Sequence, residues 1–335
     1  MTTLITGASG FLGLALTEHL LATGETVIGF DRSPPSDAAT RAFSVQPGRF
    51  VFWQGDVRDV DTLRSAMREH HPQRLVTLAA ITADEARERH ASQAIFDVNV
   101  GGVLAAITVA ADCGIKRILH ASSGSVYGAS GRLPARLIED ETPLLPESLY
   151  GLSKRAAEEA ARRLATIRGL PLVIGRLGTC FGPWEADTGM RDTLSAPLQV
   201  LTCARRGETA ILPRAGLRDW LYVRDVASAM ATLLDQPAWA HPLYNLAAGF
   251  EWSVADWCAT VADHYPGFDW RLAQPGDIPT VHYYADYDRA SMDIHRLLAD
   301  STFRPRFDLT EAASDYHHWI REYGDGPAAV STNHD

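Results

Sequence analysis

The sequence predicts an α/β protein in which a doubly wound parallel sheet carries a smaller mixed α/β lobe. Short apolar runs alternate with amphipathic helical patterns through the first half of the chain, which is typical of parallel strands covered by helices on both faces. A glycine-rich turn directly follows the first apolar run. With 335 residues, of which 46% are hydrophobic and 21% charged, the chain can bury a large core or two lobes.

Seven apolar runs have the length and composition of buried strands. They cover residues 3–6, 26–31, 50–56, 74–80, 117–123, 172–178 and 242–249. Helical patterns lie between them, near residues 11–23, 60–70, 92–112, 150–168 and 225–235. Asp225, at the start of the last helical pattern, is a candidate N-cap.

The order of these elements predicts a division of the chain into two parts and a tail. Residues 1–178 and 221–248 are expected to form the sheet-based domain that binds a cofactor. Residues 179–220, with irregularly spaced Gly, Pro and Arg, and residues 249–322 are expected to form a substrate-binding lobe. The tail, residues 323–335, is expected to be disordered.

Charge and cysteine usage narrow the class of protein. The net charge of −10 argues against nucleic-acid binding, which needs a positive surface. The four cysteines are scattered without a C-x-x-C pair, which argues against a disulfide framework or a zinc site and suits a reducing compartment. Since neither a signal-peptide pattern nor an 18-residue apolar run is evident, no membrane span is expected. We therefore expect a cytoplasmic protein with a small-molecule partner and no metal.

The glycine-rich turn "GASGFLG" places Gly7, Gly10 and Gly13 between the first predicted strand and the first predicted helix. This G-x-x-G-x-x-G spacing allows a tight turn, close approach of the backbone to a pyrophosphate, and a helix N-terminus that favours anions. A turn that serves only packing is the alternative, because a glycine triplet alone is weak evidence.

Acidic residues after the next two strands indicate which dinucleotide binds. Asp31 follows Gly13 by 18 residues, where a carboxylate can accept hydrogen bonds from the adenosine ribose and repel a 2′-phosphate. This favours NAD over NADP, although the neighbouring Arg32 could pair with such a phosphate. Asp56 either stabilises the following turn or accepts from the adenine amino group. A Rossmann-type NAD-binding fold is predicted by this order of elements, in which a strand is followed by the glycine-rich turn, a helix and an acidic residue.

Tyr150 and Lys154 lie four residues apart in a helical pattern and so share one face. Forming phenolate at neutral pH costs about 4 kcal/mol, because a free phenol has a pKa of about 10. One cation about 4 Å away stabilises the phenolate by about the same free energy. Burial destabilises the phenolate and so works against this effect. With the added charge of an oxidised nicotinamide, Tyr150 could exchange a proton with a substrate hydroxyl or carbonyl. A chance pair on an exposed helix is the alternative.

The remaining motifs make the sequence resemble a known family. These motifs are "TGASGFLG", "GDVRD" (55–59), "LAA" (78–80), "NVGG" (99–102), "SSGSVYG" (122–128), "YGLSK" (150–154), "GRLGTCFGP" (175–183), "RDWLYVRDVA" (218–227) and "YNLAAG" (244–249). Together they resemble the extended short-chain dehydrogenase/reductase family, also called the NAD-dependent epimerase/dehydratase family, over about residues 2–322. The resemblance implies NAD as cofactor, a sugar-type substrate and a homodimer.

The resemblance also implies roles for individual residues. Tyr150 would be the catalytic acid/base, Lys154 would lower its pKa and hold the nicotinamide ribose, and Ser123 would orient the substrate oxygen, with Ser122 and Ser125 as competing candidates. The residues expected at the cofactor are Gly7, Gly10, Phe11, Leu12, Gly13, Asp31, Arg32, Asp56, Val57, Leu78, Ala79, Ala80, Asn99, Tyr150 and Lys154. Asn99 has a structural or a proton-relay role. The residues expected at the substrate are Ser123, Ser125, Thr179, Arg191 and Arg218.

Several departures from the family pattern bear on the reaction and the substrate. Family dehydratases carry an acidic pair where this chain has Gly124 and Ser125, which argues against dehydration. Thr179 replaces the Asn that commonly meets a nucleotide diphosphate, and "LPRAGLRDW" and the segment 184–193 are unusual. Arg191, Arg214 and Arg218 could face a diphosphate or a sugar carboxylate, or form ordinary salt bridges. Trp184 and Trp220 either stack on the substrate or fill the core.

Three hypotheses follow. The first is a sugar or nucleotide-sugar epimerase that keeps NAD bound. The second is a dehydrogenase of a small sugar, sugar acid or polyol that releases NADH. The third is a catalytically idle NAD-sensing protein, against which the intact Tyr150, Lys154 and Ser123 argue.

Overall fold

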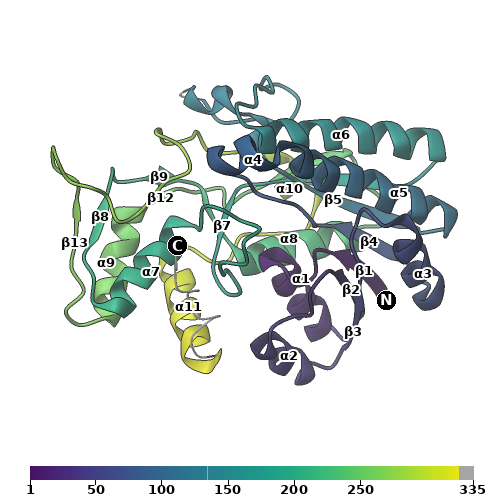
Figure 1. Cartoon of the computed structure of the whole chain (residues 1–335), viewed down its shortest axis with the longest axis horizontal. Helices are drawn as coiled ribbons and strands as arrows, with labels where there is room; N and C mark the ends of the chain where they lie inside the picture. Colours follow the sequence, from purple (N-terminus) through teal and green to yellow (C-terminus); the bar gives the residue numbers. More distant parts are fainter. Residues whose placement is uncertain (134, 324–335) are drawn as a thin grey trace.

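The computed structural model describes residues 1–133 and 135–323 (Figure 1). The tail predicted to be disordered lies outside the described residues, except for Tyr323, which ends the last helix.

The centre of the fold is a seven-stranded parallel sheet. Its strands are β1 (Thr2–Thr6), β2 (Thr26–Asp31), β3 (Arg49–Gln54), β4 (Arg74–Thr77), β5 (Arg117–Ser123), β6 (Leu172–Leu177) and β11 (Leu243–Leu246). They follow the order β11-β6-β5-β4-β1-β2-β3. The order reverses direction between β1 and β4, and the crevice at this switch point is where ligands of such sheets bind. The predicted fold class is thus confirmed.

Helices cover both faces of the sheet (Figure 1). One face carries α1 (Phe11–Ala22), α2 (Asp37–Ser44) and α8 (Val223–Asp235), and the other carries α3 (Val60–His70), α5 (Val103–Asp112) and α6 (Leu149–Arg168). The helix predicted near residues 92–112 starts earlier, because α4 (Glu85–Phe96) continues through the π-helical turn Asp97–Gly102 into α5. The sequence analysis did not predict α2.

The continuous helical segment Glu85–Asp112 departs from the expectation that no stretch could cross a membrane. Its 28 residues include a window with a mean hydropathy of 1.8, and 44% of that window is buried inside the fold. A buried core helix of a non-membrane protein has the same properties, so this is weak evidence for a span. The absence of a membrane span stays a prediction.

The later segments build the second part of the molecule beside the sheet. Three two-stranded pairs form there: β7 (Thr179–Phe181) with β10 (Trp220–Tyr222), β8 (Ala210–Leu212) with β13 (Trp270–Leu272), and β9 (Leu217–Arg218) with β12 (Trp252–Ser253). Whereas α10 (His295–Asp300) packs against β11 of the sheet, the helices of this part are α7 (Ala196–Arg206), α9 (Val254–His264) and α11 (Leu309–Tyr323). Trp184 and Trp220 are buried within it, which favours their core role over substrate stacking.

Two local expectations were wrong. The fourth strand ends at Thr77 rather than residue 80, because the chain there turns against the glycine-rich loop. Asp225 does not cap α8, which begins at Val223 after Tyr222. Instead, the buried Asp225 carboxylate accepts hydrogen bonds from the backbone N–H groups of Arg306 and Phe307 and so holds the segment that leads to α11.

Candidate active site

The glycine-rich loop has the geometry that a pyrophosphate needs. Gly7 has a φ of +73°, and a Cβ there would lie 2.6 Å from the backbone nitrogen of Ala79. A Cβ at Gly13 would lie 2.2 Å from the carbonyl oxygen of Gly7. Gly10 starts α1 without a side-chain cap, which leaves N–H groups of the first helical turn for an anion. Phe11 and Leu12, in that turn, are half-buried. The loop therefore fits the dinucleotide that the sequence predicts.

Asp31 ties this loop to the end of β2. Its carboxylate accepts from the backbone N–H of Ser9 at 3.0 Å and of Arg32 at 2.7 Å. Burial raises the pKa of Asp31, and these hydrogen bonds oppose the rise. An ionised carboxylate has acceptor sites beyond these two bonds, so Asp31 can still meet a ribose. The exposed Arg32 points its guanidinium toward Met190, with Nη2 3.8 Å from Sδ.

Replacing Asp31 by Ala is expected to weaken NAD binding and to relax discrimination against NADP. The substitution removes both the ribose acceptor and the bond to Ser9 that shapes the loop. Isothermal titration with both cofactors measures the change. An unaltered preference for NAD would show that the ribose assignment is wrong.

The other cofactor candidates lie around the same edge of the sheet. Asp56 pairs with Arg58 at 2.7 Å and accepts from its backbone N–H at 2.9 Å, which favours the turn-stabilising interpretation. Val57 packs against Gly102, where a Cβ would lie 2.6 Å from its Cγ2. Leu78, Ala79 and Ala80 follow β4 and are half-buried. Their cofactor contacts stay predictions.

Asn99 joins the loop after β4 to α6. In the π-helical turn, its Oδ1 accepts from the backbone N–H of Ile81 at 2.8 Å, and its Nδ2 donates to Ile81 O at 3.0 Å and Ser153 Oγ at 2.9 Å. Ser153 in turn donates to the carbonyl of Tyr150. All polar atoms of this fully buried side chain therefore have protein partners, which favours the structural role.

Tyr150 and Lys154 occupy the first turns of α6, which Ser148 caps by accepting from Gly151 N–H at 3.0 Å. Lys154 is buried and donates from Nζ to the carbonyl of Ala121 in β5 at 2.9 Å. Its Nζ lies 5.9 Å from the centre of the Tyr150 ring. β5 and α6 thus place the cation beside the phenol.

Burial is the largest influence on the pKa of Tyr150 and on that of Lys154. It raises the pKa of Tyr150, although hydrogen bonds with Ser123 and Thr82 and the charge of Arg191 work in the other direction. It also lowers the pKa of Lys154 to about 8, against the charge of Glu158. Burial thus outweighs the contacts that favour the phenolate, and the lowering of the Tyr150 pKa by Lys154 stays a prediction.

The three candidate serines have different surroundings. Ser123 forms the hydrogen bond with Tyr150 and accepts from Ser125 N–H at 3.1 Å. The hydroxyls of Ser122 and Ser125 are buried and, among the described residues, have no hydrogen-bond partner. The structure thus places Ser123 beside Tyr150, while its role in orienting the substrate oxygen stays a prediction, and it leaves the Ser125 hydroxyl able to bond a ligand. Thr82, which also reaches Tyr150, was not predicted, because it lies outside any motif.

The residues predicted to bind the substrate do not all lie close to one another. Arg218 donates from Nη1 to Thr179 Oγ1 at 3.2 Å. Arg191 instead pairs with Glu185 at 2.8 Å, and its guanidinium lies 5.7 Å from the ring of Phe11 at the cofactor loop. Its role at the substrate stays a prediction.

Two further arginines lie near Arg218. Arg214 pairs with Asp288 at 2.7 Å and donates to two backbone carbonyls, which is a structural role. Arg289 was not predicted, and no motif marks it. It pairs with Asp219 at 2.9 Å, and its buried Nε has no partner within the described part of the chain.

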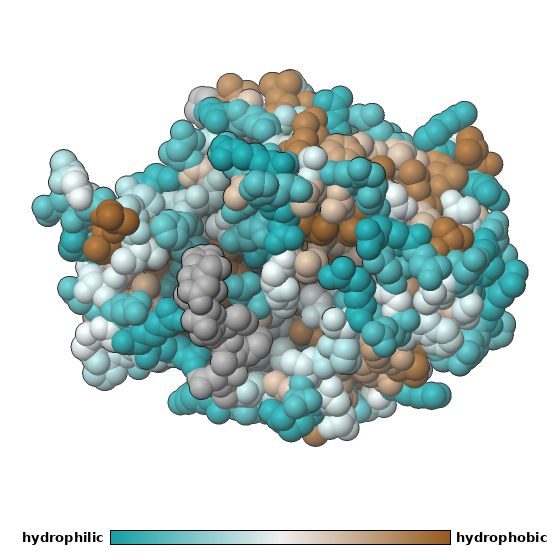
Figure 2. All heavy atoms as spheres, viewed as in Figure 1, coloured by the Kyte–Doolittle hydropathy of each residue, from teal (hydrophilic) through white to brown (hydrophobic). Residues whose placement is uncertain are grey.

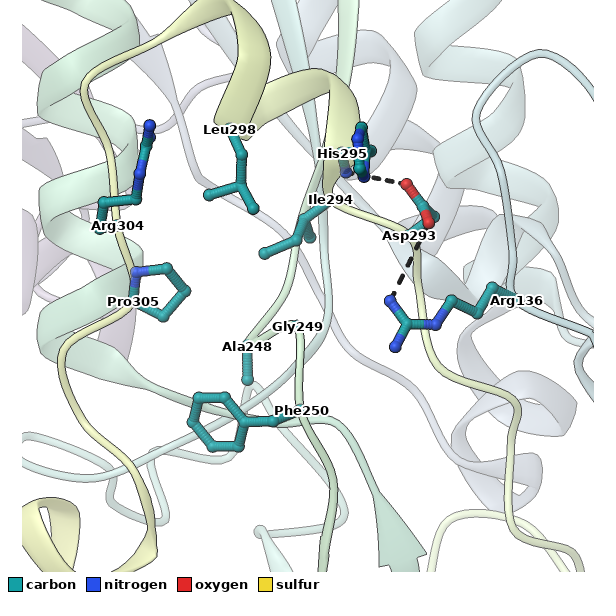
Figure 3. Close-up of a pocket in the computed structure, with 10 residues that line it drawn as sticks. All are labelled: Arg136, Ala248, Gly249, Phe250, Asp293, Ile294, His295, Leu298, Arg304 and Pro305. Atoms are coloured by element: carbon teal, nitrogen blue, oxygen red, sulfur yellow. Dashed lines mark hydrogen bonds and ion pairs between the residues drawn. The ribbon is translucent and has the colours of Figure 1, made fainter.

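A cavity of about 340 Å³ lies elsewhere, between the end of β11 and α10 (Figure 3). Apolar side chains of Phe250, Ile294 and Leu298 point into it, and Arg136 and Arg304 lie at opposite sides. None of the predicted site residues lines this cavity. The predicted catalytic residues instead lie at the carboxyl end of β5 and in the first turns of α6.

Comparisons with known proteins agree with this geometry. The family model "NAD dependent epimerase/dehydratase family" matches residues 3–247. UDP-glucose 4-epimerase of Mycolicibacterium smegmatis is 29% identical over 78% of this chain and 82% of its own length. UDP-glucose 4-epimerase of Thermus thermophilus, solved with NAD, is 25% identical, has a TM-score of 0.76, and is matched over 96% of this chain and 99% of that one.

A third comparison concerns a sugar acid. MoeE5, solved with UDP-glucuronic acid and NAD, has a TM-score of 0.76 at 24% identity and is matched over 96% of this chain and 99% of its own. At this identity the likeness shows the fold alone. The family match, the glycine-rich loop and the Tyr150–Lys154–Ser123 group together place the chain in the NAD-dependent epimerase/dehydratase family of extended short-chain dehydrogenase/reductase enzymes.

Proposed function

We propose that this enzyme is a nucleotide-sugar epimerase that inverts a secondary carbinol carbon and keeps its NAD through the cycle. The observation that carries the proposal is the position of Arg289. A Cβ at Gly124 would lie 2.2 Å from its Nη1, so a guanidinium fills the place directly after Ser123. Water elimination needs an acid and a base there, and this arrangement provides neither. Epimerisation needs only the acid/base that Tyr150 supplies.

The same arginine supports a diphosphate in the substrate. Burial, with a smaller contribution from the charge of Arg289, lowers the pKa of Arg218 to about 10, although the carboxylates of Asp219 and Asp288 oppose this shift. Two guanidinium groups thus repel one another, and the hydrogen bond that fixes Arg218 goes to the neutral hydroxyl of Thr179. A ligand with negative charge would relieve this repulsion, and a diphosphate matches two neighbouring guanidinium groups. The relative from Mycolicibacterium smegmatis is a UDP-glucose 4-epimerase and MoeE5 was solved with UDP-glucuronic acid, both of which agree with this assignment.

The chain's own residues provide the proton chemistry. The deprotonated Tyr150 oxygen takes the proton of the substrate hydroxyl. Ser123 forms a hydrogen bond with the oxygen of this substrate hydroxyl and so holds it in place. Bound NAD would supply reversible hydride transfer with the carbinol carbon, and the glycine-rich loop, Asp31 and Lys154 would hold it beside Tyr150. Tyr150 then gives the proton back to the substrate oxygen. Lys154 stabilises the negative charge that Tyr150 carries before it takes the proton and again after it returns it.

The dehydrogenase of a small sugar, sugar acid or polyol remains the second candidate. Thr179, where family members that bind nucleotide sugars commonly have Asn, uses its hydroxyl to accept from Arg218. This contact leaves less polar surface for a diphosphate and would suit a single carboxylate.

The test is incubation of the enzyme with UDP-glucose, UDP-galactose, UDP-glucuronic acid and the corresponding free sugars, followed by proton NMR and absorbance at 340 nm. The proposal predicts that an epimer of a nucleotide sugar forms without accumulation of NADH. Stoichiometric NADH with no epimer would contradict it and favour the dehydrogenase.

We also infer a cytoplasmic homodimer that binds neither nucleic acid nor membrane. Leu152 and Ile167 on α6 are 42% and 59% exposed, and Figure 2 shows hydrophobic residues gathered over α5 and α6. A second copy that pairs these helices would cover them. Light scattering is expected to give twice the mass of the chain.

A further inference from the structure

The segment 184–193, whose sequence is unusual for the family, crosses the carboxyl edge of the sheet from one face to the other. We propose that this segment, here called the strap, holds the dinucleotide in its crevice, and that Arg87 and Asp192 are the latch that keeps the strap closed. The proposal rests on the NAD dependence of the family and deepens the proposed function, because an epimerase must keep its cofactor between the two hydride transfers.

One end of the strap is fixed to α1. Trp184 is buried and adopts a φ of +71°, a conformation that is unfavourable for a residue other than glycine and persists only where surrounding contacts hold it. Its Nε1 donates to Oε2 of Glu18 in α1 at 2.8 Å. Its ring packs against Phe43 and, with centroids 5.0 Å apart, against Trp319. This end therefore cannot move without disturbing the core.

The other end is fixed to α4, on the opposite face of the sheet (Figure 1). Arg87 donates from Nε to Oδ2 of Asp192 at 2.7 Å and from Nη2 to Oδ1 at 2.5 Å, a two-pronged ion pair. Arg87 also donates to the carbonyl of Gly189 at 2.7 Å, and Asp192 accepts from the backbone N–H of Asp84 at 3.0 Å. Both side chains are half-buried, so salt screens this pair less than a fully exposed one.

Between its two ends, the strap contacts the segments that follow three neighbouring strands. It forms a bridge with Thr82, beyond β4, in which Thr82 N–H donates to Met190 O at 2.9 Å and Asp192 N–H donates to Thr82 O at 3.1 Å. Met190 Sδ lies 3.8 Å from Nη2 of Arg32, beyond β2. Arg191 lies over Phe11, beyond β1. These strands bound the switch-point crevice, so the strap lies across its opening.

This arrangement makes opening of the latch a step in cofactor exchange. The fixed Trp184 end acts as the hinge side, and the Arg87–Asp192 end is held by a polar contact that can break and re-form. Burial works to raise the pKa of Asp192, but hydrogen bonds from Arg87 and from Asp84 N–H outweigh it and lower the pKa. The pair is therefore ionised at neutral pH. While it is closed, the dinucleotide cannot leave past the strap.

The test is the rate at which bound NAD is released. The full-length enzyme is loaded with radiolabelled NAD and chased with excess unlabelled NAD, and the bound label is followed by rapid filtration. Arg87→Ala and Asp192→Asn are each expected to raise the release rate about tenfold or more, because a charge-assisted contact is lost. The double variant is expected to release NAD no faster than the faster single variant, since both residues form one latch.

Arg89→Ala is the matched control. Arg89 lies on the same helix, is 67% exposed and pairs with Glu85 of α4 itself, so its loss should leave the release rate unchanged. Release rates within twofold of the unaltered enzyme for both latch variants would overturn the proposal, as would equal acceleration by Arg89→Ala. Thermal unfolding of each variant separates a latch from a general loss of stability. Arg87→Lys, which keeps one charge but loses the two-pronged contact, should give an intermediate rate.

Failure of the latch and failure of the proposed function give different results. Rapid release of NAD from variants that still form an epimer when NAD is saturating would support the latch. Slow release from all variants together with normal epimerisation would refute the latch alone. Absence of epimerisation from the unaltered enzyme would refute the proposed function, whatever the release rates.

Discussion

Replacing Tyr150 by Phe is expected to reduce turnover by about a hundred- to ten-thousand-fold while NAD binding and the fold are preserved. The substitution removes only the hydroxyl, which bonds Ser123 and Thr82, and leaves the ring in place. Without this hydroxyl, the first turn of α6 no longer carries a group that takes the proton from the substrate oxygen. The turnover number, NAD affinity and melting temperature of the variant measure the three parts of this prediction.

Two comparisons make the Tyr150 result specific. Thr82→Val removes one hydroxyl neighbour of Tyr150 and should reduce turnover much less.

In the unaltered enzyme, turnover should rise with pH as Tyr150 loses its proton. Lys154→Met removes a cation, raises the phenol pKa and should shift this rise to higher pH. Near-normal turnover of Tyr150→Phe would refute the mechanism, and a pH profile unmoved by Lys154→Met would point to another titrating group.

Replacing Arg218 by Met is expected to raise the KM for a nucleotide sugar about ten- to a hundredfold, with a smaller effect on kcat. A hydrogen bond to a charged group contributes about 1.5–3 kcal/mol, and the half-buried Arg218 lies near Arg289 at the proposed diphosphate position. Methionine keeps much of the side-chain volume and removes the charge. Steady-state kinetics with a nucleotide sugar and with the matching sugar 1-phosphate measure the effect.

Arg214 provides the control for this experiment. It pairs with Asp288 and with two backbone carbonyls, so Arg214→Met should affect stability more than KM. If Arg218→Met left the KM for nucleotide sugars unchanged, the diphosphate would have to bind elsewhere.

Much of the sheet was predictable from local pattern, because each central strand is a nearly continuous apolar run. The departures come from contacts between distant segments. The run 74–80 is apolar to its end, yet β4 stops at Thr77, because the next residues turn against Gly7. Asp225 has the residue type of an N-cap, but a tertiary contact with residues 306 and 307 uses its carboxylate. Neither contact leaves a periodic signal in the sequence.

The candidate site likewise contains residues that a local motif predicts and residues that only the folded structure identifies. Tyr150, Lys154 and Ser123 could be predicted because their spacing and order are those of a motif, and α6 and β5 bring them together. Thr82 and Arg289 reach the site from segments far away in the chain, so only the folded structure identifies them. The strap was visible in the sequence only as an unusual segment. Its contacts with Arg87 depend on the folded positions of α1 and α4.

The most direct test of a retained cofactor is to purify the protein without added nucleotide, denature it, and identify and quantify the released nucleotide by mass spectrometry. We predict close to one NAD per chain. A protein that releases no nucleotide would contradict the closed cycle and favour the dehydrogenase, and one that releases NADP would show that Arg32, rather than Asp31, determines the ribose end of the site.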